Sequence, residues 1–119
     1  MEWAGKGEGA SSTHWVPVCA EVVIIPDGAK EIPKEAFENC TILKQIAIPS
    51  SVSTIGNWAF NKCSSLTSVT IPSSVTTIGY YAFDYCSSLK TARIARRTKI
   101  DETPGYKSFP DTCVVTRYD

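Results

Sequence analysis

The chain has 119 residues with 12 basic and 12 acidic side chains, and hydrophobic residues make up 43% of it. This length and composition predict one folded domain and exclude an intrinsically disordered chain. The zero net charge argues against binding of nucleic acid or membrane by the protein as a whole, and no apolar run reaches the roughly 18 residues of a membrane span.

The N-terminal segment precedes the regular part of the chain. Residues 1–13 are rich in glycine and serine and contain no apolar region of the signal-peptide type. We expect this leader to be flexible, and we expect an intracellular protein, or a secreted or cell-surface one if a signal has been trimmed. Residues 14–19 are expected to form an N-terminal cap in which Trp15 covers the first repeat.

Three repeats of 23 residues follow, at 20–42, 43–65 and 66–88. The second and third are identical at 14 of 23 positions, and the first shares their apolar positions. A constant period of this length indicates a solenoid, in which each coil buries its apolar face only against its neighbours. We therefore predict a single solenoid domain over residues 14–119.

Each repeat contains the same succession of predicted elements. Leu-x-x-Ile-x-Ile predicts a short strand with alternate residues buried, and a proline ends it. Ser-Ser, or Asp27-Gly28 in the first repeat, predicts a turn whose side chains bond the local backbone. Ala-Phe-x-x-Cys predicts one or two turns of α-helix or 3₁₀-helix. The predicted core includes the phenylalanine and the cysteine of each repeat: Phe37, Phe60, Phe83, Cys40, Cys63 and Cys86.

One position between strand and predicted helix varies in an informative way. Pro33 stands in the first repeat where Gly56 and Gly79 stand in the next two. Because proline fixes φ near −65°, this position is not expected to need a left-handed backbone, and it suits the first turn of a helix.

Residues 89–119 are predicted to form a C-terminal cap. Leu89–Ile94 repeats the strand pattern, after which 96–99 (Arg-Arg-Thr-Lys) replaces the Ser-Ser turn. Cys113–Tyr118 predicts a last strand that closes the stack. The acidic first half and the basic second half could attract one another head to tail, but surface ion pairs are weak and both ends are capped. We therefore expect a monomer when the protein is isolated.

The repeated motif Ile-Pro-Ser-Ser-Val-Thr-Thr-Ile-Gly-Tyr-Tyr-Ala-Phe-Asp-Tyr-Cys-Ser-Ser-Leu resembles the BspA-type leucine-rich repeat over residues 20–94. The resemblance implies an α/β repeat fold, a right-handed solenoid of 23-residue coils with a short parallel sheet on one face and short helices or 3₁₀ turns on the other. It also implies adhesion or protein–protein binding, the roles of most members whose role is assigned. It supplies no catalytic motif.

The residue types that carry chemistry are sparse. His14 is the one histidine, and no Gly-x-Ser-x-Gly motif is present. The five cysteines lack the paired spacing of a zinc site, and their odd number with three at the repeat period favours reduced, buried thiols over a disulfide framework. We therefore predict no enzyme activity, no metal and no cofactor.

Three groups of residues are candidates for binding a partner. Two apolar residues face outward on the sheet and are either part of an interface or covered by Trp15 or the leader: Val22 and Ile24. Aromatic residues on the opposite face either bind a partner or pack between coils: Trp58, Tyr80, Tyr81 and Tyr85. The one dense basic cluster is either a polyanion site or a solvated edge of the cap: Arg93, Arg96, Arg97 and Lys99.

The sequence thus predicts a non-catalytic protein–protein interaction or structural module, a small subunit or adaptor of a larger assembly. A short member or fragment of a surface-adhesion protein is the alternative, and polyanion binding through the basic cluster is the second alternative. Nucleic acid is disfavoured as a partner, since no aromatic residues are interleaved with the bases.

Overall fold

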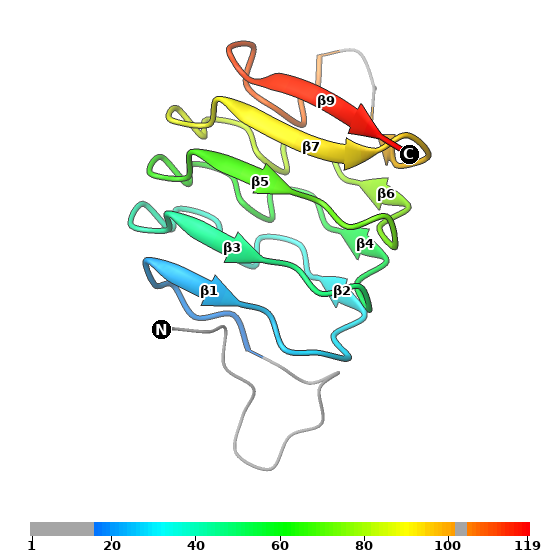
Figure 1. Ribbon diagram of the computed structural model, residues 1–119. Helices are drawn as coiled ribbons and strands as arrows, with labels where there is room; N and C mark the ends of the chain where they lie inside the picture. The colour runs from blue at the N-terminus through cyan, green and yellow to red at the C-terminus, as the bar shows by residue number, and fades with distance from the viewer. Residues whose placement is uncertain (1–15, 102–104) are drawn as a thin grey trace.

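The structure, a computed structural model, describes residues 16–101 and 105–119. These ranges contain nine short strands: β1 Val22–Ile24, β2 Glu31–Ile32, β3 Gln45–Ala47, β4 Thr54–Ile55, β5 Ser68–Thr70, β6 Thr77–Ile78, β7 Thr91–Ala95, β8 Lys99–Ile100 and β9 Val114–Tyr118. The chain winds through successive coils, and the strands of neighbouring coils lie side by side (Figure 1). The predicted leader and Trp15 lie outside the described residues.

All strand pairings are parallel. We call the face that carries β1, β3, β5, β7 and β9 the main sheet face. On it β1 pairs with β3, and β5, β7 and β9 form a second hydrogen-bonded group. The strands β2, β4, β6 and β8 form a separate sheet in that order. Paired residues on the main face are 23 apart, as in Val22 with Gln45 and Ser68 with Thr91. The structure therefore confirms a parallel solenoid with a 23-residue coil.

The predicted helices are absent from the described residues, and this part of the fold prediction is wrong. The Ala-Phe-x-x-Cys segment forms consecutive four-residue turns instead: the Ala59 N–H donates to the Gly56 carbonyl, and the Cys63 N–H to the Phe60 carbonyl, both at 3.2 Å. The Phe60 N–H donates to the Ala82 carbonyl of the next coil at 2.7 Å. Bonds between coils thus take the place of bonds along a helix.

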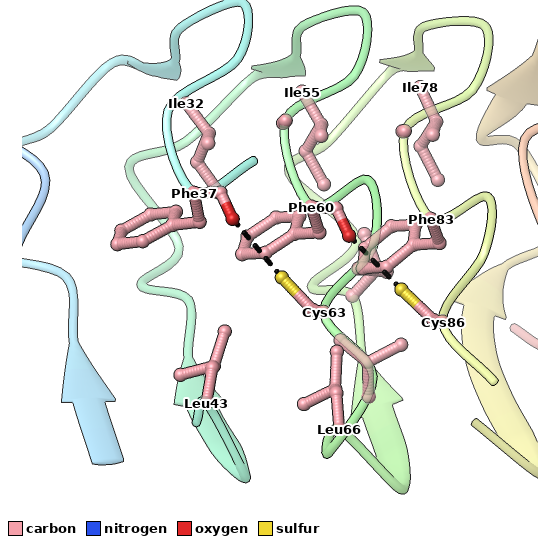
Figure 2. Packing of buried hydrophobic residues seen from close by; sticks show 14 of the residues in the cluster. Ile32, Phe37, Leu43, Ile55, Phe60, Cys63, Leu66, Ile78, Phe83 and Cys86 are labelled. Atoms are coloured by element: carbon pink, nitrogen blue, oxygen red, sulfur yellow. Dashed lines mark hydrogen bonds between the residues drawn. The ribbon is translucent and has the colours of Figure 1, made fainter. Parts of the chain in front are cut away.

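The core is a set of columns, each made of one repeat position. Phe37, Phe60 and Phe83 stack with ring centroids 5.2 and 4.9 Å apart, and their planes are nearly parallel (Figure 2). All three side chains are buried, as the sequence predicted. Phe109, from the predicted C-terminal cap, continues the column at 5.0 Å from Phe83, so the stack extends beyond the three repeats.

The repeated glycines are required by the close approach of neighbouring coils. A Cβ at Gly56 would lie 2.5 Å from the backbone nitrogen of Lys34, and one at Gly79 would lie 2.7 Å from that of Asn57. Positive φ occurs at other described glycines, Gly28 and Gly105. The position therefore does not need a left-handed backbone, as predicted, but it begins a turn rather than a helix.

The serine-rich turns also bond differently from the prediction. The Ser51 hydroxyl accepts a hydrogen bond from the Gly28 N–H at 3.0 Å and donates one to the Ala29 carbonyl at 2.7 Å. The Ser53 hydroxyl donates to the Lys30 carbonyl at 3.1 Å. These partners belong to the preceding coil, so these two hydroxyl groups join coils and do not bond the local backbone, whereas the buried hydroxyl of Ser74, at the position of Ser51 in the third repeat, has no partner among the described residues.

Candidate partner-binding surfaces

The main sheet face presents uncharged residues in its central part. Val22 and Ile24 project from β1 on this face, beside β3. Both apolar side chains face the solvent and are half-buried. The next outward side chains, on β3 and β5, are exposed: Gln45, Ala47, Ser68 and Thr70. The predicted cover for the apolar pair, Trp15, lies outside the described residues.

A shallow hollow of about 400 Å³ lies on this face and is lined by β1, β3 and β5. We call it the sheet-face hollow. Backbone pairing joins β1 to β3 and β5 to β7, but it does not join β3 to β5. Ile46 lines the hollow and is only partly buried, whereas Val23 and Val69, at the same position of the neighbouring coils, are 0% and 4% exposed. The interruption in pairing thus coincides with accessible apolar surface.

The turn side of the solenoid carries an aromatic cluster made of Trp58, Tyr80, Tyr81 and Tyr106. Trp58 stacks on Tyr81 with centroids 5.8 Å apart, and Tyr80 meets both rings edge-on. Tyr106 contacts Tyr80 and Tyr81 at 4.9 and 5.4 Å. The sequence predicted three members but missed Tyr106, which lies outside the repeat period. The rings thus pack against one another across coils, which is one of the two alternatives that the sequence left open.

Tyr85 was predicted to belong with these rings, but the structure places it elsewhere. It is 66% exposed and makes no ring contact with a described residue. It occupies the repeat position of Lys62, four residues beyond that of Trp58 and Tyr81. It is therefore an isolated exposed tyrosine.

The predicted basic cluster is divided between surfaces. Arg93 lies on the main sheet face, where its guanidinium is 5.2 Å from the ring centroid of Tyr118. Lys99 lies on β8 in the other sheet, where it lines a separate hollow of about 340 Å³ with Asp101. These two cations therefore do not converge on one site.

Arg96 and Arg97 lie at the corner between the two sheets, and both make contacts within the chain. Arg96 Nε is 2.6 Å from the Asp119 carboxylate, an exposed ion pair. Arg97 donates to the Ser73 carbonyl through Nη2 at 2.9 Å. These contacts use donors that a bound polyanion would otherwise take.

Cys40 forms a disulfide bond with Cys19, so the prediction of free thiols at these two positions is wrong. The regular spacing of Cys40, Cys63 and Cys86 gave no sign that the first would differ, because its partner lies before the first repeat. The bridge closes a loop of 21 residues, for which chain entropy predicts a stabilisation of about 3 kcal/mol. It ties the segment before β1 to the first coil.

The cysteines of the next two coils are free and buried, as predicted. The Cys63 Sγ donates to the Phe37 carbonyl at 3.2 Å, and the Cys86 Sγ donates to the Phe60 carbonyl at 3.0 Å (Figure 2). The hydrogen bond with Cys63, together with burial, raises the pKa of the Cys86 thiol above its ordinary value. Cys86 is therefore a neutral thiol that joins coils, not a reactive one.

Two negative findings concern the described part of the chain. Within it, no group of three His, Cys, Asp or Glu side chains is placed to hold a metal ion. The same residues contain no helix that is long and apolar enough to cross a membrane.

The repeat architecture and the buried Phe and Cys columns agree with a specific family. Residues 18–113 match the family model of the BspA type leucine rich repeat region, in six copies. The chain belongs to the BspA-type leucine-rich-repeat family. Proteins with such repeats are associated with protein–protein interaction or adhesion. No protein with curated annotation matches the chain.

Solved structures of bacterial leucine-rich-repeat proteins are similar to this BspA-type chain. A leucine rich cell surface protein from Faecalibacterium prausnitzii aligns over 84% of the chain and 32% of its own length, with 23% identity and a TM-score of 0.65. A leucine-rich repeat protein from Bacteroides ovatus aligns over 83% of the chain and 30% of its own length, with 26% identity and a TM-score of 0.57. The chain thus spans about a third of each protein.

Proposed function

We propose that this chain is a non-catalytic module that binds a partner protein through its main sheet face. The sheet-face hollow carries the proposal, because there the apolar side chains of Val22, Ile24 and Ile46 are accessible beside uncharged strands. An accessible apolar patch surrounded by polar, uncharged residues is typical of an interface core. An apolar side chain on the partner is the group that this hollow suits.

The disulfide between Cys19 and Cys40 supports an oxidising environment for the protein, because such bonds are rare in reducing compartments. The similar protein from F. prausnitzii is described as a cell surface protein. Both observations favour the adhesion alternative over the intracellular adaptor that the sequence favoured. Polyanion binding gains no comparable support, since Arg96 and Arg97 already contact Asp119 and Ser73.

The proposal is tested by finding which surface of the protein binds peptides selected for affinity to it. Random peptides displayed on phage are selected on the wild-type protein, and each enriched peptide is measured against two variants. Ala47→Arg places a long charged side chain in the sheet-face hollow, and Ser87→Arg places the same side chain at an exposed turn outside it. We expect enriched peptides to be apolar and to lose about tenfold or more in affinity, or ~1.4 kcal/mol, with the first variant only.

Both variants change exposed residues, so both should melt near the wild-type temperature, and this is checked first. Peptides that bind Ala47→Arg as well as they bind wild type would contradict the assignment of the sheet face. Enrichment of acidic peptides whose binding falls steeply with added salt would instead support the polyanion alternative.

A further inference from the structure

The two ends of the solenoid differ in how well their core is covered. At the N-terminal end, Val23 and Phe37 are 0% and 2% exposed. At the C-terminal end, Val115 occupies the same inward position as Val23, four coils later, and is 36% exposed. Phe109 ends the phenylalanine column and is also only partly buried. The predicted closing strand therefore leaves the C-terminal end of the core accessible.

The outer edge of β9 also has unused backbone groups. β9 pairs with β7 only (Figure 1). The Val114 N–H donates to the Lys90 carbonyl at 2.8 Å, and the Arg96 N–H donates to the Tyr118 carbonyl at 2.7 Å. Since successive residues of a strand point to opposite sides, the backbone groups of 114, 116 and 118 bond β7, and those of 115 and 117 face the open edge. An open edge of this kind is a template for another strand.

The side chain that could protect this edge is engaged elsewhere. Natural edge strands are often blunted by an exposed charge or a proline, and Arg117 is the charged residue of β9. Its Nη1 donates to the carbonyls of Ala95, Arg96 and Thr98 at 3.0, 3.1 and 2.7 Å. The guanidinium is thus folded back on the preceding coil, while Val114, on the opposite face of β9, is 59% exposed.

We propose that β9 is a self-association edge, at which two copies of the chain pair through antiparallel β9 strands about a twofold axis at Thr116. In this register Val115 of each copy lies opposite Arg117 of the other. The N–H and C=O groups of these residues face the open edge, so they can form two hydrogen-bonded pairs. A twofold contact of one surface with itself is the commonest form of protein oligomer.

The side chains on the outer face suit the same register. Thr116 of the two copies meet at the twofold axis, and cross-strand threonine pairs are favourable. The Tyr118 hydroxyl donates to the Ile71 carbonyl and Arg93 lies over the Tyr118 ring, so this ring extends from β9 over β7 and leaves the open edge clear for a second strand. Pairing would bring Val114 of one copy beside the backbone of Tyr118 of the other.

Head-to-tail stacking fits the structure less well, despite the acidic first coil and the basic last one. It would bring β9 against the N-terminal end, where the core is already covered and where the disulfide ties the preceding segment to the first coil. Among the described residues the core is more accessible at the C-terminal end than at the N-terminal end, which favours a closed dimer over a filament. The proposed dimer differs from the monomer expected from the sequence, an expectation that rested on caps at both ends and on the weakness of surface ion pairs.

Sedimentation equilibrium over a wide concentration range tests this proposal. We expect the wild-type mass to rise with concentration from 13.0 kDa to twice that value and no further. Val115→Pro removes the N–H that faces the open edge but none that bonds β7, so it should remain monomeric. Val115→Thr keeps the N–H and a β-branched side chain, and it should dimerise. Thermal melts establish that both variants are folded.

A second pair of variants separates the two modes of association. Thr116→Arg places two like charges directly opposite one another at the twofold axis and should weaken dimerisation by tenfold or more. Val18→Arg changes an exposed valine at the opposite end and should have no effect. A mass that stays at 13.0 kDa throughout, or that passes the dimer and falls only with Val18→Arg, would overturn the proposal. So would a Val115→Pro variant that dimerises like wild type.

Discussion

At the scale of single residues, two positions in each coil have positive φ although neither is glycine in any repeat. The six residues have φ between 59° and 66°: Glu35, Trp58, Tyr81, Asn39, Lys62 and Tyr85. All but Tyr81 are the third residue of a hydrogen-bonded four-residue turn, where type II geometry favours glycine or asparagine. A left-handed backbone costs an ordinary residue about 1–2 kcal/mol. Bonds between coils, such as the Lys62 N–H to the Asp84 carbonyl at 2.8 Å, hold the conformation.

This strain can be measured at Lys62, which is exposed and makes no ion pair with a described residue. We expect Lys62→Gly to leave the free energy of unfolding unchanged or to raise it by up to about 1 kcal/mol, because glycine adopts positive φ without strain. Lys90→Gly, at an exposed position with ordinary φ, should lower it by about 1 kcal/mol. Urea unfolding of both variants checks this, and equal losses would show that Lys62 is not strained.

At the scale of elements, the sequence predicted the strands better than their connections. Alternating apolar residues and the constant period were enough for β1, β3, β5 and β7, because burial of one face fixes the register. The predicted helix failed because a Phe–Cys spacing of three suits either a helix or consecutive turns. The Phe60–Ala82 hydrogen bond that decides between them joins residues 22 apart, which no local pattern reports.

For the candidate surfaces, too, the sequence predicted what the repeat period determines and missed what depends on contacts outside it. The period brought Trp58 and Tyr81 together as predicted, since residues at one repeat position stack along the solenoid. Tyr106 and Cys19 were missed because they lie outside the repeats, where no period relates them to the residues they contact. The sheet-face hollow depends on the missing pairing of β3 with β5, and their sequences do not differ from paired strands in any evident way.

The coil-joining thiols give a prediction at this scale. Without reductant, a thiol reagent should label Cys113 first, since it is partly exposed, and more quickly as pH rises, because burial raises the pKa of its thiol. Cys63 and Cys86 should react only on unfolding. Denaturation should therefore reveal three thiols, and denaturation with a reductant all five cysteines. Mass spectrometry counts the labels. Five labels without reductant would exclude the disulfide.

At the scale of the whole molecule, stability depends on contacts between neighbouring coils. A single coil has few stabilising contacts of its own, because its backbone N–H groups and its core side chains mostly contact the coils before and after it. The two ends have only one neighbouring coil each. The disulfide reinforces the first end, while the last end has the Phe109 ring and β9 alone, so the penalty for losing a ring should depend on its place in the stack.

This dependence can be tested along the phenylalanine column. Phe60 is fully buried between Phe37 and Phe83, at 5.2 and 4.9 Å, whereas Phe109 contacts one ring of the column, Phe83. Phe60→Ala should lower the free energy of unfolding by about 3–5 kcal/mol through lost burial and the cavity left behind. Phe109→Ala should cost about half as much, because its side chain is only partly buried. Urea unfolding at a concentration where the protein is monomeric measures both values. Equal losses would mean that the last coil is as tightly packed as the middle one, and they would also remove the reason for expecting an open C-terminal end.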